Sequence, residues 1–243
     1  MNAGPVAFRL GLRGMPVAAE SRIVERDIQL LREIEATEGR RPHLHVQHVS
    51  TARALDMIRA AKNEGLHVTC EVTPHHFTLT DEAVGDYDTH AKMNPPLRAE
   101  ADRLALIAGL VDGAVDCIAT DHAPHAPHDK EQEFERAPNG ITGLETALGL
   151  ALRVLHRGHG LSLSRIVALM STAPASILAL PGRGSLGPGH LADVVVFDPG
   201  AEWRFDAASS RSKSRNTPFN DASMLGKVHA TICEGRVIYR EFE

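Results

Sequence analysis

The chain has 243 residues, of which 43% are hydrophobic and 23% charged, and its formal net charge is −5. This balance is ordinary for a globular protein, and with no block of like charge it predicts neither nucleic acid nor a membrane as a partner. No apolar run approaches the ~20 residues needed to cross a bilayer. The three cysteines form no CxxC pair, so we expect no disulfide framework and no thiolate zinc site, and a reducing, cytoplasmic location.

The first 180 residues predict alternating strands and helices. Apolar residues recur at a helical period from about 19 to 36. A short β-branched run at 44–49 predicts a buried strand, and Ser50 or Thr51 then caps a helix over 52–63 that Gly65 closes. The alternation continues with a strand at 67–72, a helix at 99–112, a strand at 115–119, and helices at about 143–157 and 163–179. This order predicts parallel βαβ units.

After Gly182 the pattern changes to a glycine-rich loop and short apolar strands. These strands are expected at 193–197, 227–233 and 236–239, with Glu234-Gly235 as the hairpin turn between the last two. We therefore predict an α/β fold with an α/β domain over 1–182 and a small β-strand domain over 183–243.

Polar residues follow three of the predicted strands directly, in the segments 48–51, 71–76 and 120–125. In parallel α/β barrels the active site is built from strand ends at that face. A His and an Asp there could share a zinc ion, and the Asp could accept a proton from water. A lone His is more often structural and a lone Asp more often a helix cap, but three such segments in succession favour a metal-dependent site.

Several longer segments resemble the bacterial type I dihydroorotases of the amidohydrolase superfamily. They are HVQHVST at 45–51, EVTPHH at 71–76, KMNPPLR at 92–98, ATDHAPH at 119–125, GLET at 143–146 and RSKSRNTPF at 211–219. The resemblance runs in order along nearly the whole chain. It implies the carboxy-terminal part of a (β/α)8 metal-dependent hydrolase barrel, followed by part of a small β-sandwich-type domain.

The resemblance also implies roles for individual residues. His48 matches a zinc ligand, and Asp121 matches a carboxylate that is both a zinc ligand and the catalytic acid/base. The cofactor would be one or two zinc ions in the complete site. The residues that match substrate-binding positions are Asn94, His125, Pro138, Asn139 and Gly140. The family commonly has an aromatic residue where this chain has Asn139, which leaves the packing of that loop over the substrate open.

The implied reaction is the reversible cyclisation of N-carbamoyl-L-aspartate to L-dihydroorotate in pyrimidine synthesis, by a homodimer or in association with aspartate transcarbamoylase. Hydantoinase-like and allantoinase-like enzymes resemble the chain around 120–122, but they usually lack the segments NPPL and GLET, at 94–97 and 143–146. Two alternatives remain open. One is a hydantoinase- or allantoinase-like hydrolase, and the other is a non-catalytic scaffold subunit for aspartate transcarbamoylase.

The His-x-His motif that begins the superfamily's metal site has no match in this sequence. His43 and His45 have the right spacing, but they begin the strand that leads to His48, so we interpret them as structural. The odd separation of His45 and His48 predicts that they point to opposite faces of that strand. The first residues resemble an internal loop of the family, so we expect the chain to hold only the last three barrel strands and to be impaired alone.

Overall fold

The computed structural model describes residues 1–241, which form two compact units. Unit 1 consists of Met1–Leu144 and Ala208–Pro218, and unit 2 consists of Glu145–Ala207 and the chain from Phe219 onward. The expected division at residue 182 does not coincide with these units. The helices after Glu145 pack against a strand of the carboxy-terminal sheet, where a side chain on Gly149 would press on Met224, and so they belong to unit 2.

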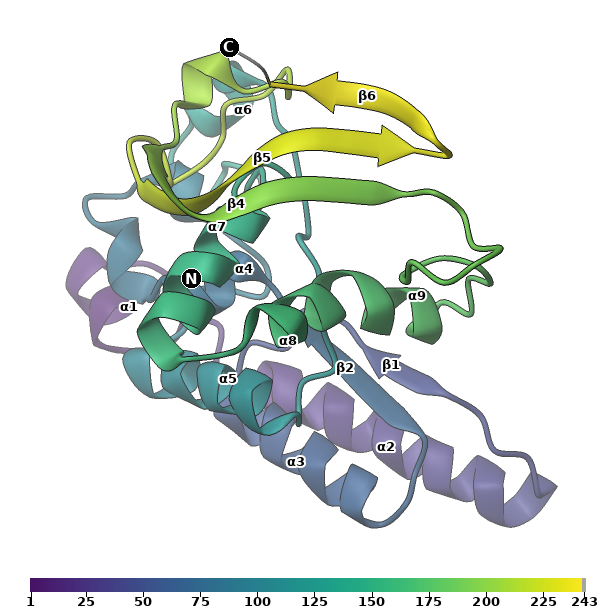
Figure 1. Ribbon diagram of the computed structural model, residues 1–243. Coiled ribbons are helices and arrows are strands. Elements are labelled where there is room, and N and C mark those ends of the chain that lie inside the picture. The colour runs from purple at the N-terminus through teal and green to yellow at the C-terminus, as the bar shows by residue number, and fades with distance from the viewer. Residues whose placement is uncertain (242–243) are drawn as a thin grey trace. The chain divides into compact units, whose positions relative to one another are not determined.

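The centre of unit 1 is a parallel sheet with the strand order β1-β2-β3, of which β1 and β2 are labelled in Figure 1. Its strands are β1 (Leu44–Val46), β2 (Val68–Val72) and β3 (Cys117–Ile118). Each strand is shorter than the sequence predicts, but the ladder continues irregularly beyond two of the ends. Val49 N–H donates to Glu71 O at 2.9 Å, and Ala119 N–H donates to Val72 O at 3.1 Å.

Two helices of unit 1 pack against this sheet, α2 (Val17–Glu38) and α3 (Ala52–Asn63), and α5 (Glu100–Asp112) packs against α3. Helix α3 lies between α2 and α5 (Figure 1) and buries Leu55 and Ile58 completely. The side chain of Thr51 accepts a hydrogen bond from Ala54 N–H, so Thr51 is the cap of α3. The predicted order of strands and helices is confirmed for this unit.

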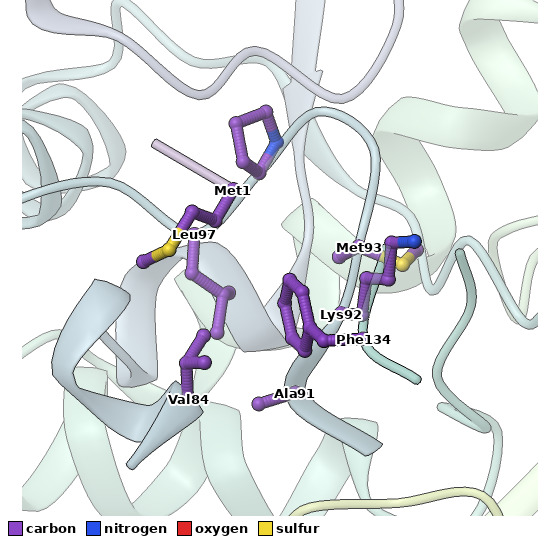
Figure 2. Close-up of a pocket in the computed structure, with 8 residues that line it drawn as sticks. Met1, Val84, Ala91, Lys92, Met93, Leu97 and Phe134 are labelled. Carbon is purple, nitrogen blue, oxygen red and sulfur yellow. The ribbon is translucent and has the colours of Figure 1, made fainter. Parts of the chain in front are cut away.

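Short elements connect the strands and helices of unit 1. They are α1 (Pro5–Leu10), α4 (Pro74–Thr78), η1 (Asp81–Val84), η2 (Thr89–Ala91) and α6 (Pro127–Lys130). Two of them, η1 and η2, help to line a cavity of about 10 Å³, and Figure 2 shows its lining residues, among them Val84, Leu97 and Phe134. That volume holds about one water molecule, and the lining is mainly apolar, so this cavity is a packing gap rather than a ligand site.

Unit 2 combines two interrupted helices with an antiparallel sheet. Each predicted helix starts as an α-helix and continues as a π-helix. The segments are α7 (Ala147–Ala151) with η3 (Leu152–Gly158), then α8 (Leu163–Val167) with η4 (Ala168–Thr172) and α9 (Ala173–Ile177). The short η5 (Ala207–Ser209) follows the first strand of the sheet. Among residues 1–241, no helix is both long and apolar enough to cross a membrane.

The antiparallel sheet of unit 2 has the order β4-β5-β6 (Figure 1), with strands β4 (Val194–Arg204), β5 (Ser223–Cys233) and β6 (Arg236–Arg240). The predicted hairpin turn is confirmed, because Glu234 and Gly235 have φ values of 49° and 77°. Strand β4 is longer than predicted. It continues past Pro199 and Gly200 through a register shift between Asp198 and Glu202.

Candidate functional site

Two predicted metal ligands lie just beyond parallel strands and share an uncommon backbone conformation. His48 follows β1 and has φ 38°, and Asp121 follows β3 and has φ 46°. A left-handed backbone costs an ordinary residue roughly 1–2 kcal/mol and is concentrated at functional sites. Glycine would adopt these φ angles without strain, yet the two positions carry the side chains of a histidine and an aspartate.

The alternation argument that separates His45 from His48 does not apply. Strand β1 ends at Val46, and the left-handed His48 leaves the pleat before alternation could reach it. Both residues contact one carboxylate. His45 Nε2 lies 3.1 Å from Glu71 Oε2, and the His48 backbone N–H donates to Glu71 Oε1 at 3.4 Å.

The electrostatics of Asp121 show that it lies near His48. Burial raises the pKa of the Asp121 carboxyl above its usual value, while His48 opposes this shift and Glu71 adds to it. A raised pKa favours a carboxyl group that carries a proton for part of a reaction cycle. The structure thus brings His48, Glu71 and Asp121 within electrostatic reach of one another.

The segment after His48 is held by a carboxylate from helix α2. Glu20 accepts hydrogen bonds from the backbone N–H groups of Ser50 and Thr51, both at 3.0 Å, and from both of their hydroxyls. Glu20 is also paired with Arg98, whose side chain is only 2% exposed, at 3.7 Å. The Arg98 guanidinium in turn donates to Ser50 Oγ at 3.1 Å. This network fixes the chain directly beyond the candidate ligand.

Asn94, a predicted substrate-binding residue, shares a groove with His48. The groove has a volume of about 450 Å³ and runs along α2 and β1, with Asn94, Pro95 and Arg98 on a third side. Asn94 is exposed, and its peptide bond to Pro95 is cis. Asp121 and His125 are not among the described residues that line this groove.

Three other predicted substrate residues, Pro138, Asn139 and Gly140, lie in one loop at 135–140, and His125 contacts this loop. His125 Nε2 donates to Asn139 O at 2.8 Å. The ammonium of Lys130, itself almost fully buried, donates to Pro138 O at 2.8 Å and to Gly140 O at 3.2 Å. Backbone carbonyls are therefore the groups that fix this loop, and the polar residue at 139 does not prevent its ordering.

Two further side chains complete the support of this loop. Lys92 Nζ donates to Glu135 O at 3.0 Å and to Ala137 O at 2.6 Å. Asn216 Nδ2 donates to Ala123 O and to Gly140 O, and Asn216 Oδ1 accepts from His125 N–H at 3.0 Å. Asn216 therefore joins the His125 segment to the loop from a point far along the chain.

Two buried histidines also lie near His48. His76 donates from Nε2 to Pro95 O, and burial lowers its pKa to about 4. The pKa of His75 is well below its usual value, through burial first and then through His76 and His48. Its buried Nε2 atom has no hydrogen-bond partner among the described residues. Both imidazoles are therefore neutral at pH 7.

The residue types at this site fit part of a zinc site. Imidazole and carboxylate are common zinc ligands, and His48 and Asp121 supply one of each, with the unpartnered His75 nitrogen nearby. Two ligands are fewer than the three protein ligands that catalytic zinc usually has. His122 and His128 add none, because His122 Nδ1 accepts from Gly143 N–H at 3.1 Å and the His128 side chain is 80% exposed.

The residues that sequence reasoning missed are the supporting ones: Glu20, Glu71, Lys92, Lys130 and Asn216. Three of them lie inside or beside the recognised segments at 71–76, 92–98 and 211–219, so their position was a usable signal. Glu20 and Lys130 have no such signal, because their partners are known only once the chain is folded.

Comparisons with known proteins identify the family. A model of the amidohydrolase family matches residues 15–239. Curated proteins named dihydroorotase are 50% identical in Anaplasma phagocytophilum and 52% identical in Syntrophotalea carbinolica, in each case over 99% of this chain. The chain covers 52% and 55% of those two proteins, so it spans about half the length of the curated relatives it matches.

Solved structures give the same picture of the fold. The L-hydantoinase (dihydropyrimidinase) of Arthrobacter aurescens superposes with a TM-score of 0.87 at 30% identity, over 94% of this chain and 50% of that one. The dihydropyrimidinase of Brevibacillus agri superposes with a TM-score of 0.86 at 24% identity, over 97% of this chain and 51% of that one. The predicted α/β fold is therefore that of the hydantoinase-like amidohydrolases.

Proposed function

Because the chain belongs to the amidohydrolase family, we propose that it is the carboxy-terminal part of a dihydroorotase. Such an enzyme interconverts N-carbamoyl-L-aspartate and L-dihydroorotate. The observation that carries the proposal is the extent of the similarity to dihydroorotases, which covers nearly every residue of the chain. In this proposal β1, β2 and β3 are the last three strands of an eight-stranded barrel, and β4–β6 belong to a small β domain.

Within the proposed reaction, His48 and Asp121 would hold zinc. A bound zinc ion would polarise the ring amide and activate water. Asp121 would move the proton between that water and the ring nitrogen, a role that the burial of its carboxyl group supports by raising its pKa. Asn94 and His125 would orient the substrate, and the loop at 138–140 would line its ring.

The proposed ligand set also sets a condition for activity. Two ligands do not make a catalytic zinc site, so the remaining ligands would come from the half of the relatives that this chain does not match. We therefore expect the 243-residue chain by itself to show no dihydroorotase turnover.

The test is to join the chain to the upstream half of a dihydroorotase relative and measure ring closure of N-carbamoyl-L-aspartate. We expect activity in the joined protein and a loss of about 10²–10⁴ in kcat for Asp121→Asn, because the acid/base group is removed. His128→Gln, an exposed substitution in the same loop, is the matched control and should change little. Full turnover in Asp121→Asn would remove that residue from the mechanism.

Two other functions are the alternatives. The likeness to L-hydantoinase favours ring opening of hydantoins, and the joined protein would then prefer a hydantoin over dihydroorotate. The other alternative is a non-catalytic subunit that binds aspartate transcarbamoylase. That function requires an inactive joined protein that still forms a stable complex with the transcarbamoylase.

A further inference from the structure

A second group of metal-ligating side chains lies on the sheet of unit 1. His45 comes from β1, Glu71 from β2 and Cys117 from β3. The strand register places His45 opposite Thr69 and Glu71 opposite Cys117, so the three side chains share one face of the sheet. One ligand atom from each of the three lies within 4.8 Å of the others. None of these three residues is among the predicted ligands.

The histidine of this group is already oriented for coordination. His45 Nδ1 is 2.7 Å from Thr69 Oγ1, and His45 Nε2 faces the Glu71 carboxylate at 3.1 Å. A hydroxyl oxygen can accept as well as donate, so Thr69 supports the tautomer that leaves the lone pair of Nε2 free. Histidine ligands of metals usually have such a partner on their second nitrogen.

We propose that His45, Glu71 and Cys117 form a separate metal site, which binds a thiophilic divalent cation such as zinc or cadmium. Tetrahedral zinc, with bonds of about 2.0–2.3 Å, holds its ligand atoms roughly 3.3–3.8 Å apart. The His45–Glu71 distance is close to this spacing, and the Cys117 sulfur, within 4.8 Å of both, needs to approach by no more than about 1.5 Å. The side chains of His45 and Glu71 are 21% and 12% exposed, so an ion from solvent can reach them.

The charges around Cys117 suit a cation. Without metal, burial and then the neighbouring Glu71 raise the pKa of the Cys117 thiol to about 12, so the thiol is protonated. A divalent ion reverses this effect, because the carboxylate that disfavours a thiolate attracts the cation that stabilises it. On binding, the thiol proton leaves to solvent and the sulfur–metal bond replaces the S–H bond.

This site changes what a metal analysis of the chain can show. One equivalent of zinc in the purified protein would not prove that His48 and Asp121 hold it, because the sulfur site has three ligands and the other has two. A test must therefore report on sulfur, which the proposed catalytic site does not contain.

The experiment is a cobalt(II) titration of the full 243-residue chain, read from the sulfur-to-cobalt charge-transfer band in the near ultraviolet. We expect a band that saturates at one equivalent and is absent from Cys117→Ser and from Cys117→Ala, with folding of each checked by circular dichroism. Cys70→Ser is the matched control. Cys70 is buried on the opposite face of β2, with its sulfur 3.5 Å from Ala114 O, so its removal should leave the band.

Two further variants separate this site from the proposed catalytic one and from a structural role. The double variant His48→Ala, Asp121→Asn should keep the band in full. Thr69→Val should weaken cobalt binding about 10–100-fold, because the outer partner of His45 is lost, while the band at saturation keeps its intensity. A folded wild-type chain without the band, or a band that Cys117→Ser retains, would overturn the proposal.

Discussion

Left-handed backbone occurs at polar residues in both units, but different contacts hold it there. In unit 2, Glu234 precedes Gly235 in the hairpin between β5 and β6, and a two-residue turn of this type requires both φ angles to be positive. In unit 1, no glycine follows His48, and its backbone N–H instead reaches Glu71 on the next strand. The positive φ angles in unit 2 follow from the turn type, although Glu234 N–H and Gly235 N–H also donate to Asp193 Oδ1 and Ala192 O, whereas the conformation of His48 has no such local cause.

The same contrast holds for the connections around the candidate site. Glu20 holds Ser50 from 30 residues away, and Asn216 holds His125 from 91 residues away. The candidate site should therefore respond to substitutions at residues such as Glu20 and Asn216, which touch neither metal nor substrate, whereas the hairpin of unit 2 should not respond to those two.

The largest effect is expected for Glu20→Ala. This change removes the acceptor of four hydrogen bonds from Ser50 and Thr51 and takes the carboxylate of its ion pair away from the buried Arg98. Breaking a buried ion pair on one side costs about 3–5 kcal/mol. We expect a loss of unfolding free energy near the lower end of that range, measured by urea denaturation.

Hydrogen exchange locates the effect of this substitution. In Glu20→Ala the amides of Ser50 and Thr51 should exchange faster, while those of β5 in unit 2 keep their wild-type rates. Glu25→Ala on the exposed side of the same helix is the control and should change stability by about 0.5 kcal/mol or less. If amide exchange became equally faster in both units, Glu20 would not act on unit 1 alone, and the contrast between the two units would be wrong.

A smaller effect is expected for Lys130→Met. The variant loses two hydrogen bonds from an ammonium group to buried loop carbonyls, which amounts to about 2–3 kcal/mol. In the joined enzyme the KM should rise because the loop at 138–140 loses its support. Lys213→Met, an exposed lysine elsewhere in unit 1, is the control.

The same variant has a pH signature. Burial, and then Lys92, lower the pKa of Lys130 to about 8, whereas an unfolded lysine titrates near 10.4. Between these values the unfolded state binds more protons, so this group makes stability rise as the pH increases from about 8 to about 10. In Lys130→Met this contribution to the rise of the unfolding free energy with pH should be absent. A variant with the wild-type pH dependence would show that Lys130 is not the group responsible.

The sequence predicts the order of helices and strands along unit 1 because the signals for them are local. These signals are the period of the apolar residues, the helix cap at Thr51 and the helix end at Gly65. It predicts the Glu234 turn for the same reason. It places His48 and Asp121 beyond strand ends but cannot predict their left-handed backbone, which no neighbouring residue requires. It interprets His45 as structural and expects no thiolate site, whereas the separate metal site that we propose would use both His45 and Cys117. The grouping of His45 with Glu71 and Cys117 depends on the register of three strands, which no single segment contains.

The smallest effect is expected from a test of the left-handed backbone itself. In this test, alanine and glycine variants are compared at positions 48 and 234. Where φ is positive, glycine should be the more stable of the two by about 1 kcal/mol, because only alanine carries the strained β-carbon. We expect this difference at both 48 and 234, with the opposite sign at the helical control Glu25, where glycine is worse by about 1 kcal/mol. Glu234 loses only an exposed ion pair with Arg183, so its variants should fold as the wild type does. If glycine gives no advantage at 48, the surrounding contacts rather than the β-carbon determine the stability there, and His48 is not held under strain.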